Sequence, residues 1–118
     1  MSDGRPRISV EYSEKAVVIA FTDEKILEEK DIQALQESVM SVIDQNHGAN
    51  MILDFGNVQF LSSAVLGLLI RISKKIYEDQ GQLRLCSINP KIHEVFKITR
   101  LTKIFDICPD VKDALDSF

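Results

Sequence analysis

Three short apolar runs alternate with segments of helical periodicity, and this alternation limits the fold more than any other feature of the chain. The runs are Met51–Phe55, Leu83–Ile88 and Ile104–Cys108, and the amphipathic segments lie between and after them. Strands that are joined through helices run parallel, with right-handed crossovers. The sequence therefore predicts an α/β fold whose sheet is mixed but mostly parallel.

The first part of the chain predicts an antiparallel hairpin. Apolar and polar residues alternate over Arg7–Tyr12, which is the period of a strand with one buried face. Ser13–Lys15 is a predicted turn, and Ala16–Phe21 is a second and more apolar strand. The charged segment Thr22–Lys30 is predicted to be a solvated connection. A hairpin therefore precedes the parallel part of the sheet.

About four segments have the spacing of amphipathic helices, with apolar residues on one face. The expected limits are Asp31 to Asn46–Gly48, Ser62 or Ser63 to Gln80–Gly81, a third helix capped by Asn89-Pro90, and 110–118. The side chains expected to face the core are Ile32, Leu35, Val39, Val42, Ile43, Val65, Leu68, Leu69, Ile72, Ile76, Ile92, Val95, Phe96, Ile98, Val111, Ala114, Leu115 and Phe118.

Length and composition bound the class of protein. A chain of 118 residues, 45% hydrophobic and 27% charged, predicts a single globular domain over residues 1–118. The net charge of −4 gives no electrostatic footprint for nucleic acid, and no apolar run is long enough for direct membrane insertion. Cys86 and Cys108 lie in apolar stretches, which is typical of buried thiols in a reduced compartment. A cytoplasmic location is expected.

The serine pair Ser62-Ser63 is the main candidate site. It opens an apolar helix at the carboxyl edge of the predicted sheet, where partner and ligand sites of such folds lie. Although the chain has 18 acidic residues, none occurs from Phe55 to Tyr77. The serines can act as an N-cap, or one of them can carry a phosphate that the helix dipole tolerates. Asp54, at the end of the preceding strand, is expected to support the loop or to orient the serines.

Catalytic chemistry is not supported by the residues. Ser62 and Ser63 lack the flanking glycines of a nucleophile elbow, and His47 and His93 do not form a triad pattern with them. The cysteines and histidines show no paired spacing for a metal, and no glycine-rich loop for phosphate is present. The sequence predicts a protein that is not an enzyme and needs no cofactor or metal.

The segment around the serine pair resembles the signature of STAS domains, and most closely the small bacterial anti-sigma factor antagonists. The similarity rests on Leu53-Asp54-Phe55, Val58, Phe60, Ser62-Ser63 and Leu66–Leu69, and continues over Asn89–Phe105. The element order and the length also fit. Two positions depart from the family pattern, because Leu61 replaces an Asp and Ala64 replaces a Gly. The family's Gly-x-Leu-Asp element after the second strand is also replaced here, by the segment that begins at Asp23.

The resemblance implies a regulator that binds an anti-sigma factor serine kinase and so releases a sigma factor. It implies that phosphorylation of Ser62, with Ser63 as second choice, abolishes binding and that a serine phosphatase restores it. The implied contact surface comprises Leu61, Ser62, Ser63, Ala64, Val65 and Gly67. Two alternatives remain open. One is a STAS scaffold or adaptor without phosphorylation, in a sensory assembly or a lipid-transport complex. The other is a small-molecule or nucleotide-binding module.

Overall fold

A computed structural model describes residues 7–118 of the chain, so the first six residues of the expected single domain lie outside the described part. The elements are β1 (Ile8–Tyr12), β2 (Val17–Phe21), β3 (Lys25–Ile26), α1 (Glu29–Gln45), β4 (Met51–Asp54), β5 (Phe60–Leu61), α2 (Ser63–Glu78), β6 (Leu83–Cys86), α3 (Pro90–Ile98), a 3-10 helix η1 (Leu101–Lys103), β7 (Asp106–Cys108) and α4 (Val111–Asp116).

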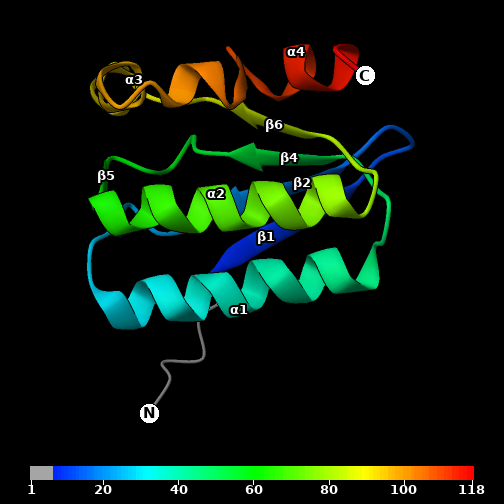
Figure 1. Cartoon of the computed structure of the whole chain (residues 1–118), viewed down its shortest axis with the longest axis horizontal. Coiled ribbons are helices and arrows are strands. Elements are labelled where there is room, and N and C mark those ends of the chain that lie inside the picture. The colour runs from blue at the N-terminus through cyan, green and yellow to red at the C-terminus, as the bar shows by residue number, and fades with distance from the viewer. Residues whose placement is uncertain (1–6) are drawn as a thin grey trace.

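The main sheet has the strand order β1-β2-β4-β6-β7, and its register confirms the predicted mixture of strand directions. β1 and β2 form the antiparallel hairpin, with Ile8 opposite Phe21. The pairs β2–β4, β4–β6 and β6–β7 are all parallel. The carboxyl ends of β2 and β4 therefore meet at one edge, beside the starts of α1 and α2 (Figure 1).

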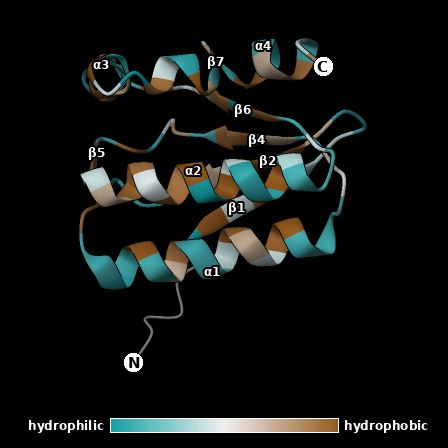
Figure 2. Cartoon of the chain, viewed as in Figure 1, coloured by the Kyte–Doolittle hydropathy of each residue, from teal (hydrophilic) through white to brown (hydrophobic). Residues whose placement is uncertain are grey.

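Helices cover both faces of the sheet. α1 and α2 lie side by side on one face, and α4 lies on the opposite face (Figure 1). The larger core joins Ile19, Leu53 and Leu85 of the strands to the inner sides of α1 and α2. Val18 and Ile52 point to the other face, into a smaller cluster with Ala114 of α4. Figure 2 shows apolar residues gathered on the strands and alternating with polar ones along α1 and α2.

The end of α2 shows why a glycine is needed after it. The helix ends at Glu78, and Gln80 rather than a glycine adopts the left-handed conformation, with φ of 72°. Gly81 follows, where the chain passes the segment before β4. A Cβ atom on Gly81 would collide with the carbonyl oxygen of Ala49. The predicted stop at Gln80–Gly81 is therefore confirmed. Gln80 adopts the left-handed conformation, and Gly81 allows the close approach to Ala49.

The segment Thr22–Lys30 is not the solvated connection that its charges predicted. It contains β3, which pairs in parallel with β5, and α1 begins at Glu29 rather than near Asp31. Ile26 of β3 is only 1% exposed and belongs to the larger core. One buried apolar side chain is enough to anchor a strand of two residues. A strand this short has no apolar pattern, so the charged residues around it predicted a solvated segment.

Several residues expected in the core of the C-terminal part are exposed. Ile98 and Val95 of α3 face solvent, because Ile92 and Phe96 supply the buried side of this short helix. The expected strand over Ile104–Cys108 begins only at Asp106, and Ile104 is exposed. Phe96 instead packs against Phe105, with ring centroids 6.1 Å apart.

Candidate functional site at the start of α2

Three polar side chains hold the loop that leads from β4 to the serine pair. Asp54 Oδ1 accepts a hydrogen bond of 2.9 Å from the backbone N–H of Gly56. Asn57 Nδ2 donates to the carbonyl oxygen of Phe21 at 3.2 Å, and Asn89 Nδ2 donates to that of Val58 at 3.2 Å. Because these contacts come from β4, the loop itself and the start of α3, the loop has a defined path across the edge of the sheet.

The strands β3 and β5 fix the serine pair from the other side. The backbone N–H of Ser62 donates to the carbonyl oxygen of Ile26 at 3.0 Å, and that of Gln59 donates to Glu24 at 2.8 Å. Leu61 pairs with Ile26 in the ladder and packs against the larger core. The position where the family pattern has Asp thus holds a partly buried apolar anchor in this chain.

Ser62 is the N-cap residue of α2 by backbone geometry, with φ of −88° and ψ of 164°. Its hydroxyl makes no capping hydrogen bond, and Oγ is buried with no hydrogen-bond partner among the described residues. At the start of α3, by contrast, Asn89 Oδ1 accepts a capping bond from the N–H of Ile92 at 2.9 Å. The cap expected at the serine pair is therefore present in backbone conformation but not in side-chain bonding.

The predicted contact residues divide between surface and core. Ser63 and Ala64 are exposed, and Gly67 is half-buried beside them. Val65 is 0% exposed, so its place in the expected contact surface is wrong, and its side chain supports the helix from within. The reason is periodicity, since Val65 faces the sheet on the same side of α2 as Leu68 and Leu69.

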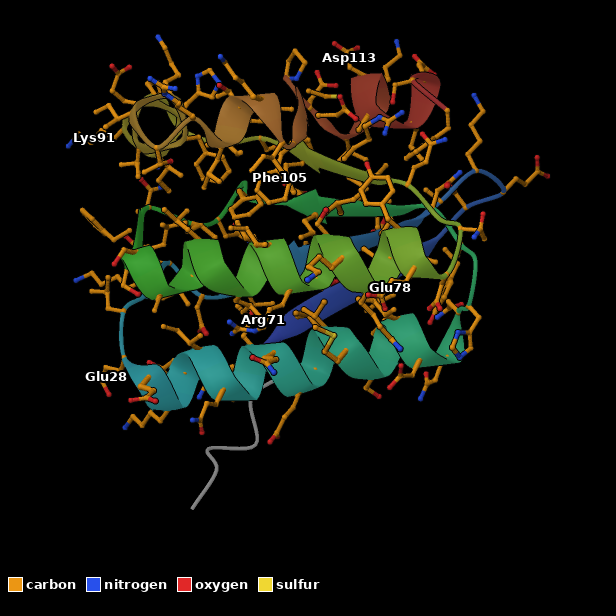
Figure 3. All side chains as sticks on the ribbon, viewed as in Figure 1. Glu28, Arg71, Glu78, Lys91, Phe105 and Asp113 are labelled. Atoms are coloured by element: carbon orange, nitrogen blue, oxygen red, sulfur yellow. The ribbon has the colours of Figure 1, made fainter. Side chains whose placement is uncertain are left out.

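A groove of about 720 Å³ runs between the first turns of α1 and α2, next to the serine pair. Its lining residues are Leu27, Glu29, Ile32, Gln33, Gln36, Ser62, Ser63, Ala64, Gly67 and Arg71. The α2 side of the groove is open at Ala64 and Gly67, because neither residue has a side chain beyond Cβ. Arg71 Nη2 donates to Gln36 Oε1 at 3.0 Å, and Figure 3 shows Arg71 between the two helices.

Two large apolar side chains are exposed at this edge: Leu27, which follows β3 and lines the groove, and Phe60 of β5. Leu27 is 50% exposed and Phe60 is 47% exposed, and the Lys25 ammonium lies 5.7 Å from the centre of the Phe60 ring. The sequence interpretation missed both residues. The dipeptide Ile26-Leu27 carries a signal for Leu27 alone, because consecutive strand residues point to opposite faces and a strand at the margin of the fold is covered on one face.

The sequence interpretation also missed Arg71 and Gln36 as site residues, since neither belongs to the apolar face of its helix. The spacing Ser63, Gly67, Arg71 repeats every four residues and places all three on one face of α2. Side chains on a helix lean toward its N-terminus, so the guanidinium lies over the preceding turn. Accordingly, Arg71 Nη1 is 3.7 Å from the position that a Cβ atom of Gly67 would occupy.

Other reactive groups give no competing site. Within residues 7–118, no three His, Cys, Asp or Glu side chains gather where they could hold a metal ion. The thiol of Cys86 is fully buried, and burial, with a smaller contribution from Asp54, raises its pKa from 9.0 to about 12. In the same described part, every helix is too short or too polar for a membrane span.

Comparison with known proteins shows which family this sequence resembles. The sequence profile of the STAS domain matches residues 8–114. Over 93 residues, 79% of each chain, the protein is 26% identical to BtrV of Bordetella bronchiseptica, named as a candidate anti-sigma factor antagonist. It is 24% identical to the anti-sigma F factor antagonist of Paenibacillus polymyxa over 109 residues, 92% of each chain.

Solved structures show the same fold. An anti-sigma-factor antagonist (STAS) domain protein from Planctomyces limnophilus superposes with a TM-score of 0.84 at 25% identity, covering 93% of this chain and 96% of that one. The described residues of this chain form the N-terminal hairpin, the mostly parallel sheet and the four α-helices that the sequence predicted. With nearly all of its described residues matched, the chain belongs to the STAS-domain family.

Proposed function

We propose that this protein is an anti-sigma factor antagonist that docks an anti-sigma factor through the surface at the start of α2. The observation that carries the proposal is the combination, at one edge, of the serine pair, the groove between α1 and α2, and the half-exposed Leu27 and Phe60. Exposed large apolar side chains beside a polar groove are typical of a protein–protein contact. The names of the relatives from Bordetella and Paenibacillus support the same role.

The proposed docking surface differs from the one that the sequence implied. It retains Leu61, Ser62, Ser63, Ala64 and Gly67 and omits the side chain of Val65. It gains Leu27, which follows β3, and Phe60 of β5. The added residues supply the apolar area that a run of serine, alanine and glycine lacks.

Phosphorylation of Ser62 is proposed as the switch that ends docking, with Ser63 as the second acceptor. A serine kinase, the anti-sigma factor itself, transfers the γ-phosphoryl group of ATP to Oγ. The bond from that phosphorus to the ADP oxygen breaks, and the hydroxyl proton passes to a base of the kinase. A serine phosphatase then hydrolyses the ester with water and returns serine and inorganic phosphate. Because Oγ of Ser62 is buried, transfer requires the side chain to rotate toward solvent.

The charge of the phosphate explains why docking would end. A phosphoserine adds about −1.5 to −2 charges where α2 begins. The helix start accepts this charge, since the first turn of α2 contains no acid. The fold is therefore retained, while an apolar or acidic partner surface is repelled from Leu27, Phe60 and the groove.

A second candidate function, a constitutive STAS scaffold, is favoured by one observation. Ser62 Oγ has no exposed surface, and the neighbouring Leu61 is an apolar anchor rather than the family Asp. A protein with this arrangement can dock a partner through the same edge without ever being modified. The experiment below separates the two.

The test combines modification with binding. The protein is incubated with ATP and a kinase-type anti-sigma factor from the same genome, and phosphopeptides are mapped by mass spectrometry. One phosphate on Ser62, with Ser62→Asp binding weakly and Ser62→Ala binding without control by ATP, is the expected result. Tight binding without any phosphate supports the scaffold. Failure of the unmodified protein to bind the anti-sigma factor contradicts the proposed role as its antagonist.

A further inference from the structure

The guanidinium of Arg71 occupies the groove beside the serine pair without a carboxylate partner in the described part of the chain. Its one hydrogen bond to a side chain there is to the neutral Gln36 Oε1, at 3.0 Å. Lys75, one turn further along α2, lies 3.8 Å from Asp44 of α1 instead. Arg71 is thus the cation of α2 whose charge faces the groove and stays uncompensated by an ion pair.

Gly67 keeps the path between Arg71 and the serines open. The guanidinium lies over Gly67, with Nη1 3.7 Å from the position of the missing Cβ. Gly67 in turn is one helical turn, about 6 Å along the axis, from Ser63. A larger side chain at position 67 would stand between the guanidinium and the start of the helix.

Ser62 supplies a hydroxyl that the folded chain leaves unused. Its Oγ is buried beside the groove and lacks a hydrogen-bond partner within residues 7–118. Because this hydroxyl makes no hydrogen bond within the described residues, a rotation of the side chain toward the groove loses none. A phosphate on the rotated side chain would enter the groove lined by Arg71.

On these observations we propose that Arg71 is the phosphate-binding residue of the switch, and that it holds phosphoserine 62 inside the α1–α2 groove. This inference rests on the proposed function and names its regulation. The planar guanidinium can donate two hydrogen bonds to phosphate oxygens, which is stronger than its present bond to a neutral amide. Gln36 positions the guanidinium before modification and releases it afterwards.

In this proposal the phosphate ends docking in two ways, by filling the groove and by adding negative charge. The phosphate fills the groove that a partner would use, and Arg71 keeps it there rather than in solvent. Glu29 is the other charged residue that lines the groove, from the first turn of α1. Its carboxylate opposes the phosphate, so the attraction from Arg71 and from the start of α2 must exceed this repulsion.

The test measures the second ionisation of the phosphate by ³¹P NMR. Phosphoserine is incorporated at position 62 by codon suppression in the otherwise unchanged protein and in Arg71→Gln, Arg71→Lys and Lys75→Gln backgrounds. A free phosphoserine has a second pKa of about 6. Contact with Arg71 is expected to lower this pKa by about one unit, as for other anions beside arginine. Arg71→Gln should return it toward 6, and Arg71→Lys should give an intermediate value.

Lys75→Gln is the matched control, because it removes the same charge from the same helix outside the groove. It should leave the titration unchanged. Identical titrations in the unchanged and Arg71→Gln proteins, or an equal effect of Lys75→Gln, would overturn the inference. Two other outcomes separate this inference from the proposed function. If Arg71 lowers the pKa while phosphoserine 62 still permits docking, the Arg71 contact stands and the proposed switch is contradicted. If phosphoserine 62 ends docking and Arg71 has no effect on the pKa, the switch stands and the Arg71 contact is contradicted.

Discussion

At the scale of single residues, the start of α2 has the backbone conformation of an N-cap but no capping hydrogen bond from the side chain. Ser62 has the extended conformation of an N-cap, yet its hydroxyl bonds to nothing in the described chain. Asp110 at the start of α4 makes the bond that Ser62 lacks, since its Oδ1 accepts from the N–H of Asp113 at 2.8 Å. The buried hydroxyl of Ser62 is therefore expected to cost stability rather than to add a capping bond.

This difference predicts opposite effects of removing the two side chains. Asp110→Ala should lower the free energy of unfolding by about 1 kcal/mol, because a capping bond is lost. Ser62→Ala should leave it unchanged or raise it, because an unpaired buried hydroxyl is removed. Urea denaturation of both variants measures this. If Ser62→Ala costs as much as Asp110→Ala, the hydroxyl has a partner that this account omits.

Cys86 gives a prediction on the alkaline side of the pH range. Burial raises the pKa of its thiol from 9.0 to about 12, so the folded state holds the proton more tightly than the unfolded state. The contribution to stability is complete below pH 9 and is lost as the pH rises toward 12. Cys86→Ala should flatten the decline of thermal stability in this window relative to the unchanged protein. An equal decline in both proteins would contradict the buried thiol.

At the scale of elements, the β3–β5 ribbon is the feature that sequence patterns could not reveal. The longer strands and the helices follow from periodicity, because each buries a stripe of several apolar residues. β3 and β5 have two residues each, so no period exists to detect, and the charges around Ile26 predicted solvent. The serine pair was located from sequence, but Leu27, Phe60, Gln36 and Arg71 join it only through this ribbon and the packing of α1 against α2.

Ile26 of β3 and Leu27, the residue that follows it, provide a matched pair of variants. Ile26→Ala should destabilise the fold by about 2–5 kcal/mol, because a side chain only 1% exposed leaves a cavity. Leu27→Ala should change stability by less than about 0.5 kcal/mol, since its side chain is half exposed. Partner binding should follow the reverse order among folded proteins, with Leu27→Ala the weaker binder. Chemical denaturation and calorimetric titration with the anti-sigma factor distinguish these effects, and full affinity in Leu27→Ala would exclude it from the surface.

At the scale of the whole molecule, the proposed docking edge is separate from the face of the sheet that α4 covers. The face under α4 is closed by a small apolar cluster and by Arg84, which bonds Ser117 Oγ at 3.0 Å and lies 4.5 Å from the centre of the Phe118 ring. The carboxyl ends of β2 and β4 instead carry loops fixed by Asp54, Asn57 and Asn89. Under the proposed switch, this separation is expected to let a phosphate at the docking edge act without unfolding the domain.

The central claim is that a phosphate on Ser62 controls docking while the fold stays intact. The most direct measurement is the affinity of the anti-sigma factor for two otherwise identical proteins, one unmodified and one with phosphoserine at position 62, by calorimetric titration. The account predicts at least tenfold weaker binding of the phosphorylated protein, about 1.4 kcal/mol, with the same circular dichroism spectrum. Equal affinity of the two folded proteins would contradict it.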